Sequence, residues 1–228
     1  MYTKPRTFIS EFQTLNKMHK FEQDVVKNEP MFFNSSIEFA YENGGPITRN
    51  FIENLPGEYH NGVFDSRVHM LMPGWFPAIP GYHHDDVDRP INIAPGKHFL
   101  TAGQPDYDNQ TKFSKHILAL VNGNICPTKF VIGECTPPVI FDAEEIIYKI
   151  WHNHIVREIE AGNLLEVDIP SNHLIQFDCN TFHTASSAID NGWRWFGRVS
   201  INTNRQNKIT NEIRKQVQVY LECLMQGW

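Results

Sequence analysis

Four short segments between residues 164 and 203 constrain the fold of this chain more than any other feature of its sequence. Each segment alternates apolar and polar residues over a few positions, and residues that favour turns separate one segment from the next. The pattern predicts a run of short strands, with a hairpin turn at Asp190-Asn191-Gly192 before the last of them. The predicted strands are residues 164–169, 173–177, 181–187 and 193–203.

Further strands are expected earlier in the chain, at residues 67–72, 116–121 and 129–132. Residues 73–81 contain five proline and glycine residues, which a helix does not tolerate. We therefore expect the residues directly after position 81 to be extended.

The first part of the chain is expected to be helical and then irregular. Residues 10–28 carry apolar side chains at near-helical spacing, and Ser10 can serve as the N-cap. Residues 44–62 are rich in glycine, proline and asparagine, which predicts a loop.

Two more helices are expected later in the chain. Residues 142–162 have Asp142 as a natural N-cap and Gly162 as a natural C-terminal stop. A terminal helix is expected to start at Thr210. Its apolar face would consist of Ile213, Val217, Leu221 and Leu224.

Many short strands with a few helices are typical of a mainly β domain. At 228 residues and 41% hydrophobic content, the chain suits a single domain with a sizeable core. We expect residues 1–228 to form one double-stranded β-helix, a cupin-like jelly-roll barrel, whose core spans about residues 67–203. Helices at the N-terminus, at residues 142–162 and at the C-terminus would flank this barrel.

Composition and charge limit the classes of binding partner and the cellular compartment that we expect for this protein. The net charge of −6 disfavours binding to long nucleic acids, which requires clustered lysine and arginine. No apolar run is long enough to span a membrane, and the N-terminus has no apolar signal-peptide region. The four cysteines lack the C-x-x-C spacing of metal and redox motifs, which favours free thiols in a cytoplasmic protein.

Two segments far apart in the chain together offer a set of metal ligands. On an extended segment residues i and i+2 share a face, so either His83 with Asp85 or His84 with Asp86 could bind one metal. A third ligand is available from His183, which follows an apolar strand and a polar turn. Two histidines and one carboxylate on one face of a metal are typical of non-haem Fe(II) oxygenases.

Two arginines lie on the predicted strand at residues 193–203. Arg194, Arg198 and Ser200 alternate onto one face of that strand. Cations that point into a barrel are costly unless an anion meets them, and a guanidinium binds a carboxylate through two hydrogen bonds. The alternative is that both arginines form surface salt bridges on an edge strand.

The order of the strands, candidate ligands and arginines in residues 67–203 resembles that of the Fe(II)/2-oxoglutarate-dependent dioxygenase superfamily. The resemblance is to its phytanoyl-CoA hydroxylase-like and taurine dioxygenase-like branches. Members of the family usually have an aromatic residue before the metal histidine, and Tyr82 precedes His83. The resemblance thus favours His83 and Asp85 over the neighbouring pair, with His183 as the distal ligand.

The same resemblance suggests which residues hold 2-oxoglutarate. Arg198 and Ser200 are similar to an R-x-S element that binds its distal carboxylate, whereas Arg194 with Arg198 resembles the spacing of the taurine dioxygenase branch. Arg198 is the favoured ligand because Ser200 could add a second donor, and Arg194 is the alternative. Thr128 resembles a carboxylate-binding threonine of a G-P-T-x-F stretch, although Cys126 replaces its glycine.

The resemblance implies an enzyme that uses Fe(II), 2-oxoglutarate and O2 to hydroxylate or otherwise oxidise a C–H bond of a small molecule, with release of succinate and CO2. Desaturation or ring closure would use the same site. Two other functions share the predicted fold. One is a cupin-type metal-dependent isomerase, which needs no inward pair of arginines, and the other is a barrel that binds a ligand without turnover.

Overall fold

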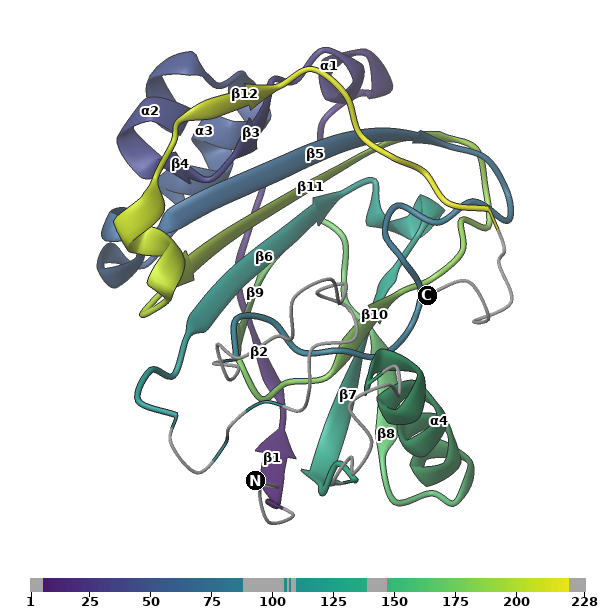
Figure 1. The fold of residues 1–228 in the computed structure, drawn as a ribbon. Helices are drawn as coiled ribbons and strands as arrows, with labels where there is room; N and C mark the ends of the chain where they lie inside the picture. The colour runs from purple at the N-terminus through teal and green to yellow at the C-terminus, as the bar shows by residue number, and fades with distance from the viewer. Residues whose placement is uncertain (1–5, 88–104, 106, 108–109, 139–146, 222–228) are drawn as a thin grey trace, which may run out of the picture.

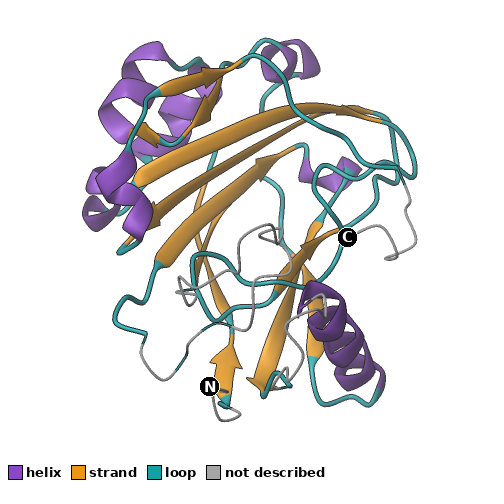
Figure 2. Cartoon of the chain, viewed as in Figure 1, coloured by secondary structure: helices purple, strands orange, loops and turns teal. Residues whose placement is uncertain are grey.

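The computed structural model describes residues 6–87, 105, 107, 110–138 and 147–221 of the chain. Within them the protein is mainly β, with antiparallel sheets and few helices (Figures 1 and 2). The strand pairing forms two larger sheets and one small ribbon, and it closes no barrel among the described residues. None of the described helices is long and apolar enough to cross a membrane.

The larger sheet has six strands and forms the central layer of the protein (Figure 1). Its longest strand lies near the middle, between two neighbours that are distant from it in the sequence. The strands in spatial order are β2 (Phe12–Lys17), β9 (His173–Asp178), β6 (Lys115–Val121), β11 (Gly192–Ile201), β5 (Val63–Leu71) and β4 (Ser35–Ser36).

The second sheet is built around β7 (Thr128–Cys135). One edge of β7 pairs with β8 (Leu165–Asp168), and β1 (Phe8–Ser10) and β10 (His183–Ala185) pair with it at different positions along its length. In a separate two-stranded ribbon, β3 (Met31–Phe33) pairs with β12 (Glu212–Arg214).

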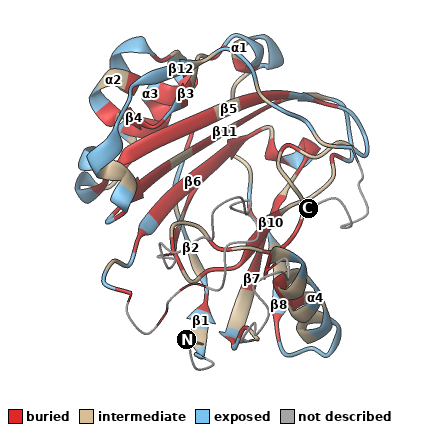
Figure 3. Cartoon of the chain, viewed as in Figure 1, coloured by how far each residue is buried: buried red, intermediate tan, exposed pale blue. Residues whose placement is uncertain are grey.

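Helices cover one face of the six-stranded sheet (Figure 3). Side chains of α1 (Gln23–Lys27), α2 (Ile37–Asn43) and α3 (Pro46–Glu53) pack there against alternate residues of the central strands, forming the largest apolar cluster. Helix α4 (Ile147–Glu160) packs instead beside the second sheet. Among the described residues, three short 3-10 helices lie in connections: η1 (Gly57–Asn61), η3 (Gly123–Ile125) and η4 (Asn204–Lys208).

The predicted strands from residue 67 to residue 203 are confirmed, with shifts of a few residues at their ends. The hairpin at Asp190-Asn191-Gly192 is wrong, because β10 and β11 belong to different sheets. The turn signal instead marks the point where the chain passes from one sheet to the other.

The helix predicted at residues 10–28 is wrong except for its last turn. The chain there forms β1 and β2, followed by the short helix α1. The Ser10 hydroxyl does not cap a helix but donates to the Val131 carbonyl at 2.6 Å and accepts from the Phe182 amide at 3.1 Å. Pairing with strands from the middle and end of the chain therefore overrides the local periodicity.

The loop predicted at residues 44–62 is also wrong, because this segment contains α3 and η1. Pro46 occupies the first turn of α3, where its missing N–H costs nothing. The cap of this helix comes from a distant residue. The Glu29 carboxylate accepts hydrogen bonds from the amides of Gly45, Ile47 and Thr48 at 2.8–3.2 Å.

The terminal helix predicted from Thr210 is wrong. Ile213 lies in β12, and the chain then continues without helix to Leu221. Leu224 lies outside the described residues. The helix predicted at residues 142–162 is confirmed over Ile147–Glu160, and Gly162 follows its end with a φ of 77°, while Asp142 lies outside the described residues.

Candidate metal centre

The chain brings His83, Asp85 and His183 together between the two sheets. His83 and His183 face each other across an isolated antiparallel bridge, with reciprocal backbone hydrogen bonds of 3.1 and 3.0 Å. Asp85 lies two residues further along the extended segment that the prolines and glycines of residues 73–81 enforce. One ligand atom from each of the three residues lies within 4.8 Å of the others, so the group could hold a metal ion.

Backbone carbonyls fix the orientation of both imidazoles. Nδ1 of His83 lies 2.8 Å from the Gly81 oxygen, and Nδ1 of His183 lies 3.1 Å from the Thr181 oxygen. Because a carbonyl only accepts hydrogen bonds, each Nδ1 carries a proton, and the other ring nitrogen of His183, Nε2, lies 3.3 Å from an oxygen of Asp85. Metal-binding histidines are commonly oriented in this way.

Aromatic rings limit the movement of the two histidines. Phe130 stacks on His183 at a centroid distance of 5.2 Å, and Phe177 contacts the same ring edge-on at 5.3 Å. Tyr148 of α4 contacts His83 edge-on at 6.2 Å. The ligand atoms are therefore held in place by packing as well as by hydrogen bonds.

Electrostatics favour the protonation states that bind a divalent cation. Burial and the neighbouring His183 lower the pKa of His83 to about 4, so its ring is neutral at neutral pH. Burial alone would raise the pKa of Asp85, but Arg198 and His183 outweigh it and hold that pKa well below its usual range. A neutral imidazole and an ionised carboxylate are the forms in which these residues coordinate metals.

The neighbouring pair, His84 and Asp86, does not join this group of ligands. His84 is buried against Phe182 and Trp151, with ring centroids at 4.2 and 4.6 Å, and its Nε2 lies 2.8 Å from the Tyr107 hydroxyl. Burial raises the pKa of Asp86, which disfavours its charged form. Of the two pairs that the sequence left open, the structure groups His83 and Asp85 with His183.

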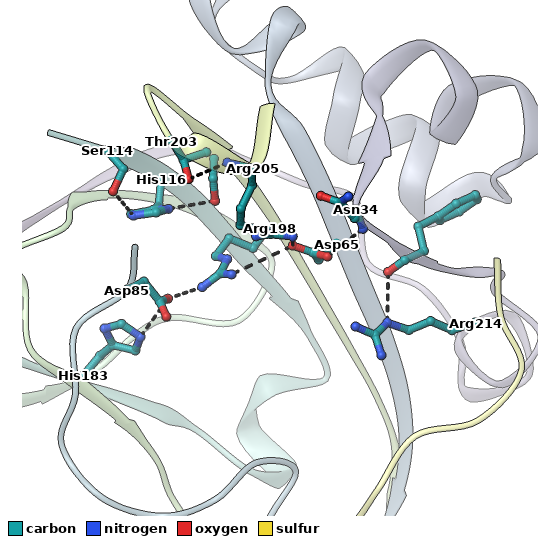
Figure 4. Close-up of polar contacts among 12 residues, drawn as sticks. Asn34, Asp65, Asp85, Ser114, His116, His183, Arg198, Thr203, Arg205 and Arg214 are labelled. Carbon is teal, nitrogen blue, oxygen red and sulfur yellow. Dashed lines mark hydrogen bonds and ion pairs between the residues drawn. The ribbon is translucent and has the colours of Figure 1, made fainter. Parts of the chain in front are cut away.

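Arg198 lies directly beside Asp85, which in turn contacts His183 (Figure 4). From β11 its guanidinium forms an ion pair with Asp85 and approaches Asp65 of β5 at 3.9 Å. Burial would lower the pKa of Arg198, but Asp85, Asp86 and Asp65 raise it above its ordinary value. Arg198 is thus compensated by carboxylates of the protein itself.

Arg194 lies four residues before Arg198 on β11 and has a different environment. Its side chain is 2% exposed and donates to the Thr128 hydroxyl at 2.9 Å, while its Nε has no hydrogen-bond partner. No carboxylate of the described residues forms an ion pair with it. Burial consequently lowers its pKa, opposed only by Cys126.

Ser200 is not available as a second donor beside Arg198. Its hydroxyl lies 2.8 Å from Nδ1 of His116, and Nε2 of His116 lies 3.1 Å from the Ser114 hydroxyl. All three residues are fully buried. This closed chain of hydrogen bonds ties β6 to β11 and does not line the pocket.

The triad and both arginines line one cavity of about 470 Å³, within the usual range for small-molecule sites. Sequence reasoning missed most of its other polar residues. Strand β5 directs Asp65, Arg67 and His69 into the cavity, a period-2 pattern that could have been noticed in the sequence. The remaining missed residues are Tyr148, Arg205, Arg214 and Tyr220.

Comparison with known proteins adds no relative from which a function could be transferred. No family model, no curated protein and no solved structure matches this chain.

Proposed function

We propose that this protein is an Fe(II)- and 2-oxoglutarate-dependent oxygenase that oxidises a C–H bond of a small molecule. The observation that carries the proposal is a single cavity that holds both a His-Asp-His triad and a buried arginine without a carboxylate partner among the described residues. Two histidines and one carboxylate suit Fe(II) and leave the opposite side of the metal open. The arginine suits the far end of a dicarboxylate cosubstrate.

A jelly-roll fold is part of this proposal, and the strand order supports it. The larger sheet holds β9, β6, β11 and β5 in this spatial order, and the second sheet holds β8, β7 and β10. The bridge between His83 and His183 adds the extended metal-binding segment beside β10. Together these make eight segments in two antiparallel layers, the arrangement expected of a double-sheet jelly roll.

Arg194 is the better candidate for the distal carboxylate of 2-oxoglutarate, although the sequence motif favoured Arg198. A buried cation is costly until an anion meets it, and Arg194 has only the Thr128 hydroxyl. Arg198 is already paired with Asp85 and Asp65, and Ser200 is held by His116. Arg194 and Thr128 would therefore bind the carboxylate together.

Arg198 would act on the metal ligand rather than on the cosubstrate. Its ion pair with Asp85 fixes one carboxylate oxygen and leaves the other to a metal. The carbonyls of Gly81 and Thr181 orient the two imidazoles, and the aromatic rings around them exclude water. Bound iron would supply activation of O2 coupled to conversion of 2-oxoglutarate to succinate and CO2.

An anaerobic visible titration tests this proposal. Fe(II) is added to the metal-free protein, and 2-oxoglutarate is then added to detect the charge-transfer band of its iron chelate. We expect Arg194→Gln to weaken 2-oxoglutarate binding by about tenfold to a hundredfold, the value of hydrogen bonds to a charged group. Arg198→Gln should instead weaken Fe(II) binding, because Asp85 loses its partner.

Arg157→Gln serves as the matched control, because Arg157 is exposed on α4 outside the cavity. Succinate release on admission of O2 would complete the support. Iron binding without a band would contradict the proposal and favour the cupin-type isomerase or the ligand-binding barrel.

A further inference from the structure

Two strands present three rows of side chains to the cavity. Across β5 and β11 the paired inward residues are Asp65 with Arg198, Arg67 with Phe196, and His69 with Arg194. Successive rows are about 7 Å apart, because two residues of a strand separate them. Arg67 therefore lies between the levels of Arg198 and Arg194, on the neighbouring strand.

The charges that line the cavity are not balanced by its carboxylates. Five arginines line it, against Asp65, Asp85 and Asp86. Asp85 pairs with Arg198, and Asp65 approaches both Arg198 and Arg205. Arg194 is assigned to 2-oxoglutarate by the proposed function. Within the described part of the chain, Arg67 and Arg214 form no ion pair with any carboxylate.

Arg67 is a half-buried cation among other cations. Burial lowers its pKa, and Arg214 and Arg198 lower it further, against the opposing effects of Asp65 and Tyr220. Like charges in a partly dry site repel each other strongly. Such an arrangement is favourable only when an anion lies between the guanidinium groups.

Arg214 reaches the same cavity from β12, at the far end of the described chain. Its Nε donates a hydrogen bond to the Phe32 carbonyl at 3.3 Å (Figure 4). Its guanidinium lies over the Phe33 ring at 4.3 Å from the centroid. The hydrogen bond and the ring fix its plane, which pre-organises the remaining N–H groups for a planar or tetrahedral anion.

His69 adds a neutral hydrogen-bonding group in the row of Arg194, next to the row of Arg67. It is 1% exposed, and neither ring nitrogen makes a hydrogen bond of good geometry, although the backbone of Gln218 lies close enough to oppose the lowering of its pKa. Burial, Arg194 and Arg67 lower its pKa to about 3, so the ring is neutral at physiological pH. A buried imidazole whose hydrogen bonds are incomplete is stabilised by a ligand that completes them.

We propose that Arg67 and Arg214, with His69 beside them, bind an anionic group of the oxidised substrate, which is therefore an organic acid or a phosphate ester. The proposal rests on the proposed function, because it takes Arg194 as the site of 2-oxoglutarate. Pro77, Ile79 and Phe196 also line the cavity and would contact an apolar body between the anionic group and the oxidised carbon.

Calorimetric titration with three six-carbon compounds tests the inference. Hexanoate, hexyl phosphate and 1-hexanol are titrated under anaerobic conditions into protein saturated with Fe(II) and 2-oxoglutarate. We expect at least one of the two anions to bind about tenfold or more tightly than the alcohol, as charge-assisted hydrogen bonds predict. Comparison of hexanoate with hexyl phosphate identifies which anion the site prefers.

Arg67→Gln and Arg214→Gln should each weaken binding of the preferred anion by about tenfold, while 2-oxoglutarate affinity stays unchanged. Arg157→Gln should change neither affinity. Arg67→Gln should also raise the melting temperature of the ligand-free protein, because it removes repulsion from Arg214 and Arg198. Two independent variants keep the test decisive if one of them fails to fold.

Three results would overturn the inference. These are equal affinity for the alcohol and both anions, full affinity for the anions in both variants, and displacement of the bound anion by excess 2-oxoglutarate. The same titrations in metal-free protein separate this inference from the proposed function. If the iron chelate of 2-oxoglutarate never forms, the metal-free protein should still bind the anion through Arg67 and Arg214.

Discussion

The two faces of the six-stranded sheet differ in chemistry although they alternate along the same strands. On β5, Phe64 and Val68 point to the helix-covered face, whereas Asp65, Arg67 and His69 line the cavity. The first face is apolar and fully packed, and the second carries charges that need partners. The comparison teaches that stability and chemistry are assigned to opposite sides of one sheet, so that changes on one side should leave the other intact.

The largest effect on stability is expected from Trp195→Ala on the helix-covered face. Trp195 is fully buried, contacts Phe51 at a centroid distance of 5.6 Å and covers the position above Gly197, where a Cβ would lie 2.1 Å from its ring. Loss of this ring should cost about 3–5 kcal/mol of unfolding free energy, measured by urea denaturation. Loss of Fe(II) affinity in the folded variant would contradict the separation of the two faces.

His183→Ala should have the opposite profile, with its main effect on metal binding. We expect Fe(II) affinity to fall by more than about 100-fold, because removing mere partners of metal ligands already costs up to that much. Equilibrium dialysis of the folded protein measures it. His84→Gln is the control, since His84 packs among aromatic rings outside the triad. If His84→Gln alone abolished iron binding, His84 and Asp86 would replace His83 and Asp85 as the ligand pair.

A smaller effect, dependent on pH, is expected from His69→Gln. The folded-state pKa of His69 is about 3, below the ordinary value of 6.5, so protons bind the unfolded chain preferentially. Its contribution is intact above pH 6.5 and is lost as the pH falls towards 3. Between pH 7 and pH 5 this loss amounts to about 2 kcal/mol of unfolding free energy.

Urea denaturation at pH 7 and pH 5 measures this contribution as the difference between wild type and variant. Glutamine does not titrate, so the variant should lose less stability than the wild type between the two pH values. Equal losses in both proteins would show that His69 does not remain neutral in the folded state, and would remove the neutral donor from the cavity face.

The strands were predictable because their alternation is a local property, and the failures occurred where distant partners decide the structure. Phe12 and Leu15 fit a helical spacing, and only pairing of β2 with β9, with a shift of register after Thr14, selects the strand. The turn at residues 190–192 was recognised, but the sequence does not state that its flanking strands enter different sheets.

The grouping of the three candidate ligands was predictable for the same reason. The spacing of His83 and Asp85 is a local pattern, and the family resemblance supplied His183. The roles of the arginines could not be read in this way, because they depend on which carboxylates face them. Asp65 reaches Arg198 only through the register of β5 against β11, and Arg214 reaches the cavity only through the pairing of β12 with β3.

The pairing of β2 with β9, and of β12 with β3, has a consequence for how the chain folds in time. Partners from opposite ends of the sequence must meet before these edges of the structure gain any stability, so the entropy of closing long loops is lost first. Such topologies fold in milliseconds to seconds rather than microseconds. During that interval unpaired strand edges are open to other chains, so the yield of refolding should fall as protein concentration rises.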